Sequence, residues 1–188
     1  KRVDLSAAAP TADGLASLFA QLGGTPREVW LEIGFGGAEH LIWQAGHNPG
    51  IGLIGAEPFE EGVVKALAAI EDHSLGNVLI HPDDARGLLR WLPAASIARA
   101  FILFPDPWPK RKHVKRRLIS PALLALLARV MKPAAELRIA TDIGDYARTL
   151  MISVRQEGSF GWTAREAADW RSRPADWPAT RYEAKAMQ

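Results

Sequence analysis

The sequence predicts an α/β protein with a doubly wound, mostly parallel sheet and helices on both faces. Two observations support this prediction. Short apolar runs alternate along the chain with longer stretches of helical periodicity, and a glycine or an acidic residue follows each run within three residues. Strands that alternate with helices in this way form parallel β-α-β units. We treat residues 1–26 as an N-terminal lead-in and residues 27–188 as a single domain.

Five strands and five helices are expected between residues 29 and 156. The runs that we assign to strands are Val29–Ile33, Ile51–Ala56, Val78–Ile80, Phe101–Phe104 and Leu137–Ala140. The helical stretches are about 38–44, 60–71, 85–91, 118–130 and 144–156, and the fourth begins near a Ser-Pro cap at residues 120–121. The weakly amphipathic stretch Leu15–Leu22 is assigned to the lead-in rather than to the core. The last thirty residues have poor periodicity, and one interpretation of them is a final hairpin at the sheet edge.

The composition argues against several classes of protein. Cysteine is absent, which removes disulfides, thiolate metal ligands and a cysteine nucleophile. No apolar run approaches the roughly 18 residues of a membrane span, and no signal-peptide pattern occurs. His40, His47, His73 and His81 lack the spacing of metal ligands. We therefore expect no membrane association and no metal site.

One segment, Phe101–Arg117, concentrates charge and chemistry. Its apolar run ends in a proline-rich turn that carries Asp106 and Trp108, and six Lys or Arg residues follow in Lys110–Arg117. Because the net charge is +2, the rest of the chain carries a net charge of −4. A localised basic patch indicates an anionic partner such as a nucleic acid. A solvated basic surface is an equally good interpretation of the basic run taken alone.

The first predicted strand ends in an acid and two glycines. Gly34 and Gly36 permit a tight turn and a close approach of the backbone to a ligand, although such a turn also occurs without one. A dinucleotide site would have a third glycine at position 39, where this chain has Glu39. Glu32 before the glycines favours a cofactor with positive charge, and S-adenosylmethionine has an ammonium, a sulfonium and no phosphate.

Acidic residues also follow the second and third predicted strands. Ligands of open α/β sheets bind at the carboxyl ends of the strands, where Glu57 is placed to accept both hydroxyls of a ribose. Asp84 can accept from an adenine amine or cap the following helix, and the two roles are compatible. Together with Glu32 these acids predict an adenosyl cofactor. Trp108 can either stack on a base or pack beneath the turn.

Several motifs resemble one family over about residues 29–185. LEIGFGGAEHL, IGAEPFEEGV, HPDDA, FPDPWPKRKHVKRR, IATD and TRYEAK occur in this order and closely resemble the bacterial tRNA (guanine-N7)-methyltransferases. The resemblance implies transfer of a methyl group from S-adenosylmethionine to N7 of a guanosine in the tRNA variable loop. It also implies a Rossmann-like, seven-stranded sheet with one antiparallel strand near the C-terminus. With a tRNA substrate and no targeting signal, we expect a cytoplasmic protein.

The resemblance also implies the functional residues. Glu32, Gly34, Gly36, Glu57, Asp84 and Asp106 would form the cofactor site, with Asp106 also catalytic. The substrate contacts would be Lys110, Asp142, Thr180, Arg181, Tyr182 and Glu183, and the RNA contacts Lys112, His113, Lys115, Arg116 and Arg117. Guanine N7 carries a lone pair and no proton, so we expect Asp106 to orient the base and stabilise charge rather than to abstract a proton.

Two departures from the family pattern leave alternatives open. Ala38 stands where many members have a third glycine, and its methyl group either crowds the cofactor or stiffens the helix start. Val114 replaces a polar residue of the basic run. An alternative function is an RNA-binding protein that retains the fold with impaired catalysis. Another alternative is methylation of an adenine amine. The turn Asp106-Pro107-Trp108 argues against it, because this turn has one proline fewer than the turn of such enzymes.

Overall fold

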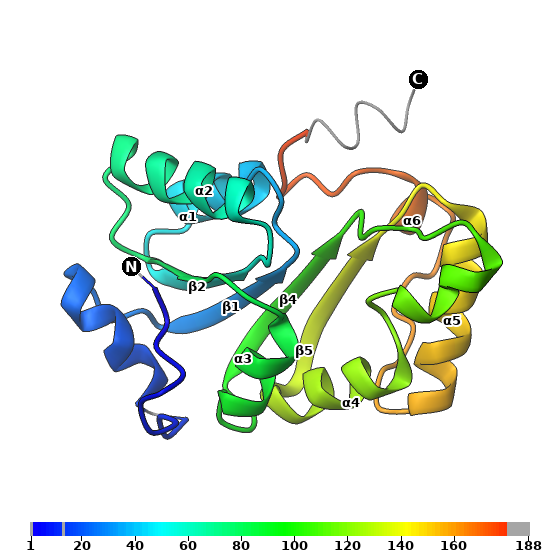
Figure 1. The fold of residues 1–188 in the computed structure, drawn as a ribbon, viewed down its shortest axis with the longest axis horizontal. Helices are drawn as coiled ribbons and strands as arrows, with labels where there is room; N and C mark the ends of the chain where they lie inside the picture. Colours follow the sequence, from blue (N-terminus) through cyan, green and yellow to red (C-terminus); the bar gives the residue numbers. More distant parts are fainter. Residues whose placement is uncertain (1, 13, 180–188) are drawn as a thin grey trace.

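The computed structural model describes residues 2–12 and 14–179, which contain a five-stranded parallel sheet (Figure 1). The strands are β1 (Glu28–Ile33), β2 (Ile51–Ala56), β3 (Val78–His81), β4 (Ile97–Leu103) and β5 (Met131–Ala140). Their spatial order is β3-β2-β1-β4-β5. The chain therefore builds outward from β1 to β3 and then returns to the other side of β1 with β4 and β5. This reversal places a topological switch point between β1 and β4.

Helices cover both faces of the sheet, which confirms the doubly wound α/β fold (Figure 1). The elements are η1 (Leu15–Leu22), α1 (Glu39–His47), α2 (Glu60–Asp72), α3 (Ala85–Trp91), η2 (Arg111–Arg116), α4 (Pro121–Val130), α5 (Gly144–Glu157) and α6 (Ala168–Arg171), of which η1 and η2 are 3₁₀ helices. One buried cluster lies between the sheet and α1 and α2, and a second between the sheet and η1, α3, α4 and α5. Neighbouring strand residues join opposite clusters, as Leu53 and Ile54 do. This explains why the strand runs are continuously apolar.

The η1 segment belongs to the core, so the prediction that it stays outside the core is wrong. Leu15 and Phe19 are each 1% exposed. Gly52 of β2 makes room for Phe19, because a Cβ atom at this glycine would lie 2.7 Å from the ring. Farther upstream, the backbone N–H of Val3 donates to the carbonyl of Ile80 (2.8 Å). The N-terminal residues therefore pack against the sheet through both side chains and backbone.

Two strands begin earlier than the apolar pattern indicated. Polar residues interrupt the runs before Phe101 and Leu137, yet β4 begins at Ile97 and β5 at Met131. These interruptions pair with one another across the two strands: Arg99 lies opposite Glu136 in the ladder, and their side chains form an ion pair (3.1 Å). Cross-strand pairs of opposite charge stabilise a sheet, so polar residues here extend the strands.

The count of seven strands is not confirmed. Residues 158–179 form no strand; after α6 they continue as a strap, defined here as residues 172–179. The strap passes from the α5 side of the sheet toward α1 (Figure 1), and the carboxylate of Asp176 binds Arg99 of β4 (3.1 Å) and Arg138 of β5 (2.6 Å). Residues 180–188, which would complete the predicted terminal hairpin, lie outside the described residues.

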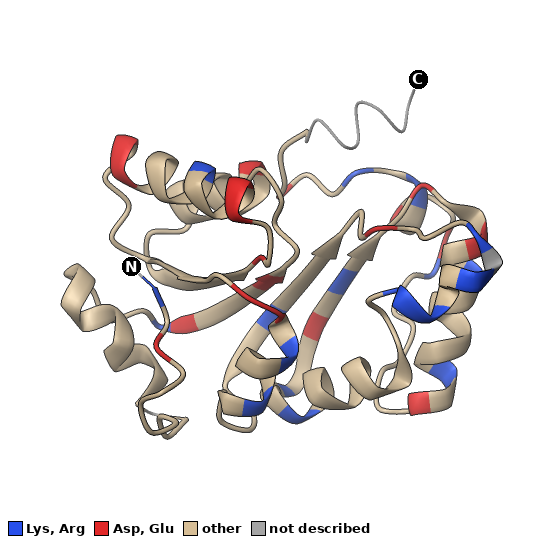
Figure 2. Ribbon diagram, in the orientation of Figure 1, with Lys and Arg blue, Asp and Glu red and all other residues tan. Residues whose placement is uncertain are grey.

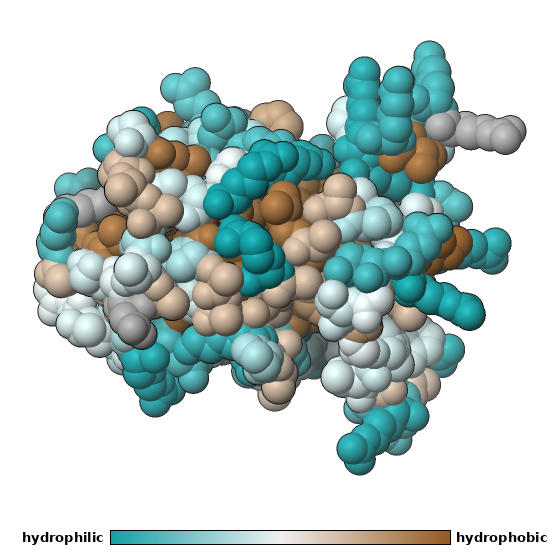
Figure 3. Space-filling view, turned by 90° about the horizontal axis from the view of Figure 1, so that it is seen from below, coloured by the Kyte–Doolittle hydropathy of each residue, from teal (hydrophilic) through white to brown (hydrophobic). Residues whose placement is uncertain are grey.

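The helices and the surface of the described residues bear on membrane association and metal binding. None of their helices is long and apolar enough to cross a membrane. Seen from below, the projecting side chains are mostly hydrophilic, and hydrophobic groups show between them (Figure 3). Within residues 2–12 and 14–179, no three His, Asp or Glu residues are grouped so that they could hold a metal ion.

Candidate active site

A cleft of about 510 Å³ opens at the carboxyl ends of β1, β2 and β4, next to the switch point. Five segments line it: the glycine turn after β1, the turn between β2 and α2 with the start of α2, the start of α3, the turn after β4, and the end of η2 with the residues after it. The lining includes Gly34, Gly36, Glu57, Phe59, Lys65, Asp84, Arg86, Asp106, Trp108 and Arg116. The structure thus brings five of the predicted cofactor residues to one cleft, where open sheets bind their ligands.

The glycine turn after β1 has a left-handed backbone at alternate residues. Gly34 (φ 72°), Gly36 (φ 52°) and Ala38 (φ 64°) all have positive φ, which glycine adopts freely and alanine does not. The methyl group of Ala38 is fully buried in the cluster beneath α1 and α2, and Ala38 does not line the cleft. Of the two alternatives for Ala38, the structure therefore argues against crowding of a cofactor, and stiffening of the helix start stays a prediction.

Glu57 connects the end of β2 to the glycine turn. One carboxylate oxygen accepts the backbone N–H of Gly36 (2.8 Å), and the other accepts that of Phe59 (3.0 Å). Gly62 lets α2 come close, since a Cβ atom there would lie 2.4 Å from the Gly36 carbonyl oxygen. A carboxylate offers about four lone-pair sites, so two remain for hydroxyl donors in the cleft. Glu57 can hold the turn and bind a ribose at the same time.

Glu32 has a buried partner that the sequence analysis did not anticipate. Its carboxylate lies 2.7 Å from Nδ1 of His40, and both residues are 3% exposed. They line a small cavity that shares Gly34, Leu103 and Phe104 with the cleft. The signal in the sequence is weak: His40 falls on the buried face of α1, one turn before Gln44.

Asp84 caps helix α3. Its side chain accepts the backbone N–H of Arg86 (2.7 Å) and pairs with the Arg86 guanidinium (2.6 Å). The predicted capping role is therefore confirmed. Asp84 also lines the cleft, which leaves a contact with an adenine amine open to it.

The turn after β4 is strained on both sides of Asp106. Phe104 (φ 50°) and Trp108 (φ 42°) adopt the left-handed region, which costs a bulky residue about 1–3 kcal/mol. Asp106 is exposed and lines the cleft. Strain of this kind clusters at functional sites, where the surrounding structure fixes an unfavourable backbone.

Trp108 belongs to the cleft wall rather than to a buried core cluster of the described residues. Its ring lies perpendicular to the His113 ring (5.7 Å between centroids), and the Arg116 guanidinium lies 5.1 Å from the Trp108 ring centroid. The side chain is half-buried. Neither predicted role, stacking on a base or packing beneath the turn, is decided by these contacts.

Arg117 differs from the other residues of the basic run, because its side chain is bound within the protein. It is 5% exposed, and its guanidinium donates to the Pro107 carbonyl (2.9 Å), to Thr149 (2.7 Å) and to Asp145 (2.5 Å). These bonds tie the Asp106 turn to helix α5. The burial and the three internal bonds argue against an RNA contact by the Arg117 side chain, which instead anchors the turn.

The other basic residues remain on the surface. Lys110, Lys112, Lys115 and Arg116 are exposed and His113 is half-buried. Lys and Arg residues gather around η2 and α5 (Figure 2). Asp142 is exposed after β5 and does not line the cleft. The four predicted substrate residues Thr180, Arg181, Tyr182 and Glu183 lie outside the described residues.

Comparison with known proteins agrees with this geometry. Residues 26–188 match a family model described as a putative methyltransferase. Over 162 residues the chain is 54% identical to a tRNA (guanine-N(7)-)-methyltransferase of Ruegeria pomeroyi, covering 86% of this chain and 68% of the relative. A relative of the same name from Hyphomonas neptunium is 50% identical over 175 residues, with 93% of this chain and 80% of the relative covered. The chain belongs to the tRNA (guanine-N7)-methyltransferase family.

A solved structure supports the fold assignment. A SAM dependent methyltransferase from Aquifex aeolicus matches with a TM-score of 0.54 and 18% identity over 76% of this chain and 77% of that chain. At this identity the likeness concerns the fold alone, and it confirms a Rossmann-like methyltransferase fold for this member of the family.

Proposed function

We propose that the protein transfers a methyl group from S-adenosylmethionine to N7 of a guanosine in the tRNA variable loop. The observation that carries this proposal is the position of Asp106. It lies in one cleft with Glu57 and Asp84, and the exposed side chains of Lys112, Lys115 and Arg116 follow it in sequence. The names of the relatives, which are 50–54% identical, support the same reaction. A tRNA substrate implies a cytoplasmic location.

The side chains of the cleft fit a cationic adenosyl cofactor. Two of its basic residues are paired internally, Lys65 with Glu61 (2.5 Å) and Arg86 with Asp84 (2.6 Å). Glu57 keeps acceptor sites for ribose hydroxyls, and the acid at position 39 disfavours a pyrophosphate at the start of α1. In this proposal Glu57 holds the ribose, Asp84 the adenine amine and Glu32 the ammonium.

The bound cofactor would supply an electrophilic methyl group on a sulfonium. Guanine N7 has an in-plane lone pair and no proton, so its attack requires no general base. Asp106 orients the purine and stabilises the positive charge that develops on its ring, which is an electrostatic contribution. The strained turn and its anchor Arg117 hold that carboxylate in place before the substrate arrives.

The basic residues of η2 would bind tRNA phosphates. Lys112, Lys115 and Arg116 are exposed, and His113 lies between them and Trp108. Specificity for guanine would come from acceptor groups facing its N1 and N2 donors. The residues proposed for substrate recognition are Lys110, Asp142, Thr180, Arg181, Tyr182 and Glu183. The buried methyl group of Ala38 removes the main reason for expecting impaired catalysis.

The deciding experiment uses unmodified tRNA and labelled S-adenosylmethionine. We expect label in the tRNA and borohydride-aniline cleavage at one guanosine of the variable loop. A matched tRNA with 7-deazaguanosine at that position has no N7 and should accept no label. Label without cleavage would indicate another target atom, and no label in either tRNA would contradict the proposal.

A further inference from the structure

We infer that His40 is a positioning residue that holds Glu32 for the cofactor ammonium, and that its tautomer is fixed by the Gln44 amide, which the C-terminal strap orients. The inference rests on the proposed function, since it concerns the cofactor site. It begins with the orientation of a side-chain amide. The Gln44 amide oxygen accepts from Nδ2 of Asn48 (3.0 Å), and its nitrogen donates to the backbone carbonyl of Asp176 (2.7 Å). A carbonyl can only accept, so the strap fixes which end of the Gln44 amide is the donor.

This orientation determines the tautomer of His40. The same Gln44 nitrogen lies 3.1 Å from Nε2 of His40, so that ring nitrogen must accept. In a neutral imidazole the other nitrogen then carries the hydrogen. Nδ1–H of His40 therefore donates to Glu32, 2.7 Å away. One carboxylate oxygen of Glu32 is committed to His40, and the second can meet a cation.

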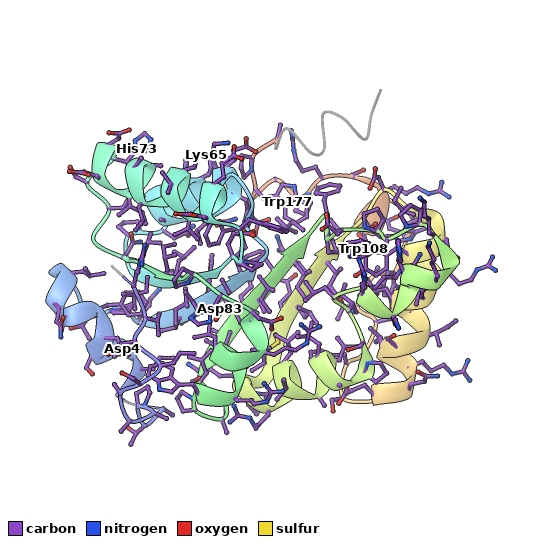
Figure 4. The ribbon with its side chains drawn as sticks, viewed as in Figure 1. Asp4, Lys65, His73, Asp83, Trp108 and Trp177 are labelled. Carbon is purple, nitrogen blue, oxygen red and sulfur yellow. The ribbon has the colours of Figure 1, made fainter. Side chains whose placement is uncertain are left out.

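Two aromatic rings pack against His40 and restrict its rotation. The Phe101 ring of β4 lies 4.7 Å from the His40 ring, and the Trp177 ring of the strap lies 5.7 Å away and perpendicular to it. Trp177 lies near the carboxyl ends of the strands on the side of α1 and α2 (Figure 4). A carboxylate that is hydrogen-bonded to a fixed histidine has a better defined position than one that is hydrogen-bonded to mobile water.

The strap is itself anchored on the sheet. The carboxylate of Asp176 bridges Arg99 and Arg138, so two strands set the position of the carbonyl that Gln44 binds. Residues 180–183, proposed to bind the substrate, follow the strap in sequence. The strap that orients Gln44 and the segment proposed to bind the substrate are therefore contiguous in sequence.

Two ligands separate a positioning role from a structural one. S-adenosylhomocysteine carries the amino-acid group that Glu32 would bind, and 5′-methylthioadenosine carries the adenosine without it. His40→Leu fills a similar volume with an aliphatic side chain and removes the N–H donor. His40→Asn keeps an N–H donor near the position of Nδ1. In calorimetry we expect His40→Leu to lower the affinity for S-adenosylhomocysteine at least about tenfold. The affinity for 5′-methylthioadenosine should fall less than about twofold. His40→Asn should remain within about threefold of the parent for both ligands.

His47→Leu is the matched control, because His47 lies on the same helix, is exposed, and contacts the carbonyl (2.9 Å) and the ring (3.9 Å between centroids) of Trp43, away from Glu32. It should change neither affinity. Equal losses for the two ligands in His40→Leu, or no loss for S-adenosylhomocysteine, would overturn the inference while leaving the methyl transfer intact. A parent that binds neither ligand would overturn the proposed cofactor as well.

The tautomer of His40 can be measured directly in the parent protein, so the result does not depend on the folding of a variant. Two-bond ¹H–¹⁵N spectra distinguish a protonated from an unprotonated ring nitrogen in histidine. We expect Nδ1–H and a bare Nε2 at His40, with the resonance assigned by its loss in His40→Asn. The opposite tautomer, or a ring protonated at both nitrogens at neutral pH, would overturn the inference.

Discussion

The cofactor half and the RNA half of the proposed site are built in opposite ways. Glu32 and Glu57 are 3% exposed, and hydrogen bonds from His40 and from backbone N–H groups orient them. The side chains of Lys112, Lys115 and Arg116 are exposed on a short 3₁₀ helix. A small cation is recognised by acceptors fixed in advance, whereas a polyanion is attracted by mobile surface charge. The Asp106 turn joins the two halves, and Arg117 anchors it from below.

The largest expected effect tests the turn that joins the halves. Asp106→Ala should lower the single-turnover methylation rate about 10²–10³-fold, because it removes a charge that faces the developing cation. Asp106→Asn keeps shape and hydrogen bonding and should still lose at least about tenfold. Full activity of the Asn variant would contradict the electrostatic role. Asp72→Asn, at the exposed end of α2, is the matched control and should retain the parent rate.

A matched pair of substitutions separates the buried arginine from the surface charges. Arg117→Met should lower the free energy of unfolding by about 3 kcal/mol, because it breaks three hydrogen bonds at a buried cation. Lys115→Met should leave unfolding within about 0.5 kcal/mol of the parent and reduce the salt slope of tRNA binding by about one. Urea unfolding and filter binding over a salt series measure the two effects. An unchanged salt slope for Lys115→Met would favour a merely solvated surface.

A change at Glu57 tests how the cofactor half is held together. Glu57→Gln should leave one of two backbone N–H groups without an acceptor and cost about 1–3 kcal/mol of unfolding free energy. The affinity for S-adenosylhomocysteine should fall as well, since the glycine turn loses its support. Calorimetry and urea unfolding measure both quantities. A loss of affinity for tRNA alone would contradict the division of the site into two halves.

The smallest effect concerns the strap and depends on pH. Partial burial alone would raise the pKa of Asp176, but the hydrogen bond and charge of Arg138, with the charge of Arg99, outweigh it and lower the pKa. A lowered pKa contributes stability that is present above the unfolded-state pKa of about 3.9 and is lost as pH falls through the folded-state value. Asp176→Asn should therefore be less stable than the parent at pH 7, and this difference should shrink below about pH 4. A difference that stays constant with pH would contradict the ion-pair account of the strap.

The parts of the fold that follow local rules were predictable. Ser120 followed by Pro121 predicted the start of α4, and the Ser120 hydroxyl does accept the Leu123 N–H (3.3 Å). The starts of β4 and β5 were missed because Arg99 in β4 and residues 132–136 of β5, which include Lys132, Pro133 and Glu136, interrupt the apolar pattern. The cross-strand partners that stabilise these residues are distant in sequence. The seven-strand count came from the family resemblance and not from the periodicity of this chain.

The sequence by itself determined the alternation of strands and helices, the acids and glycines at the strand ends, and the concentration of charge after Asp106. These features are local, since apolar periodicity and turn chemistry act over a few residues. The tertiary structure alone decided that Arg117 points inward, that Leu15 and Phe19 join the core, and that His40 meets Glu32 beneath Trp177. Those outcomes depend on partners far apart in the chain, such as Gln44 and Asp176, and no local pattern records such a pairing.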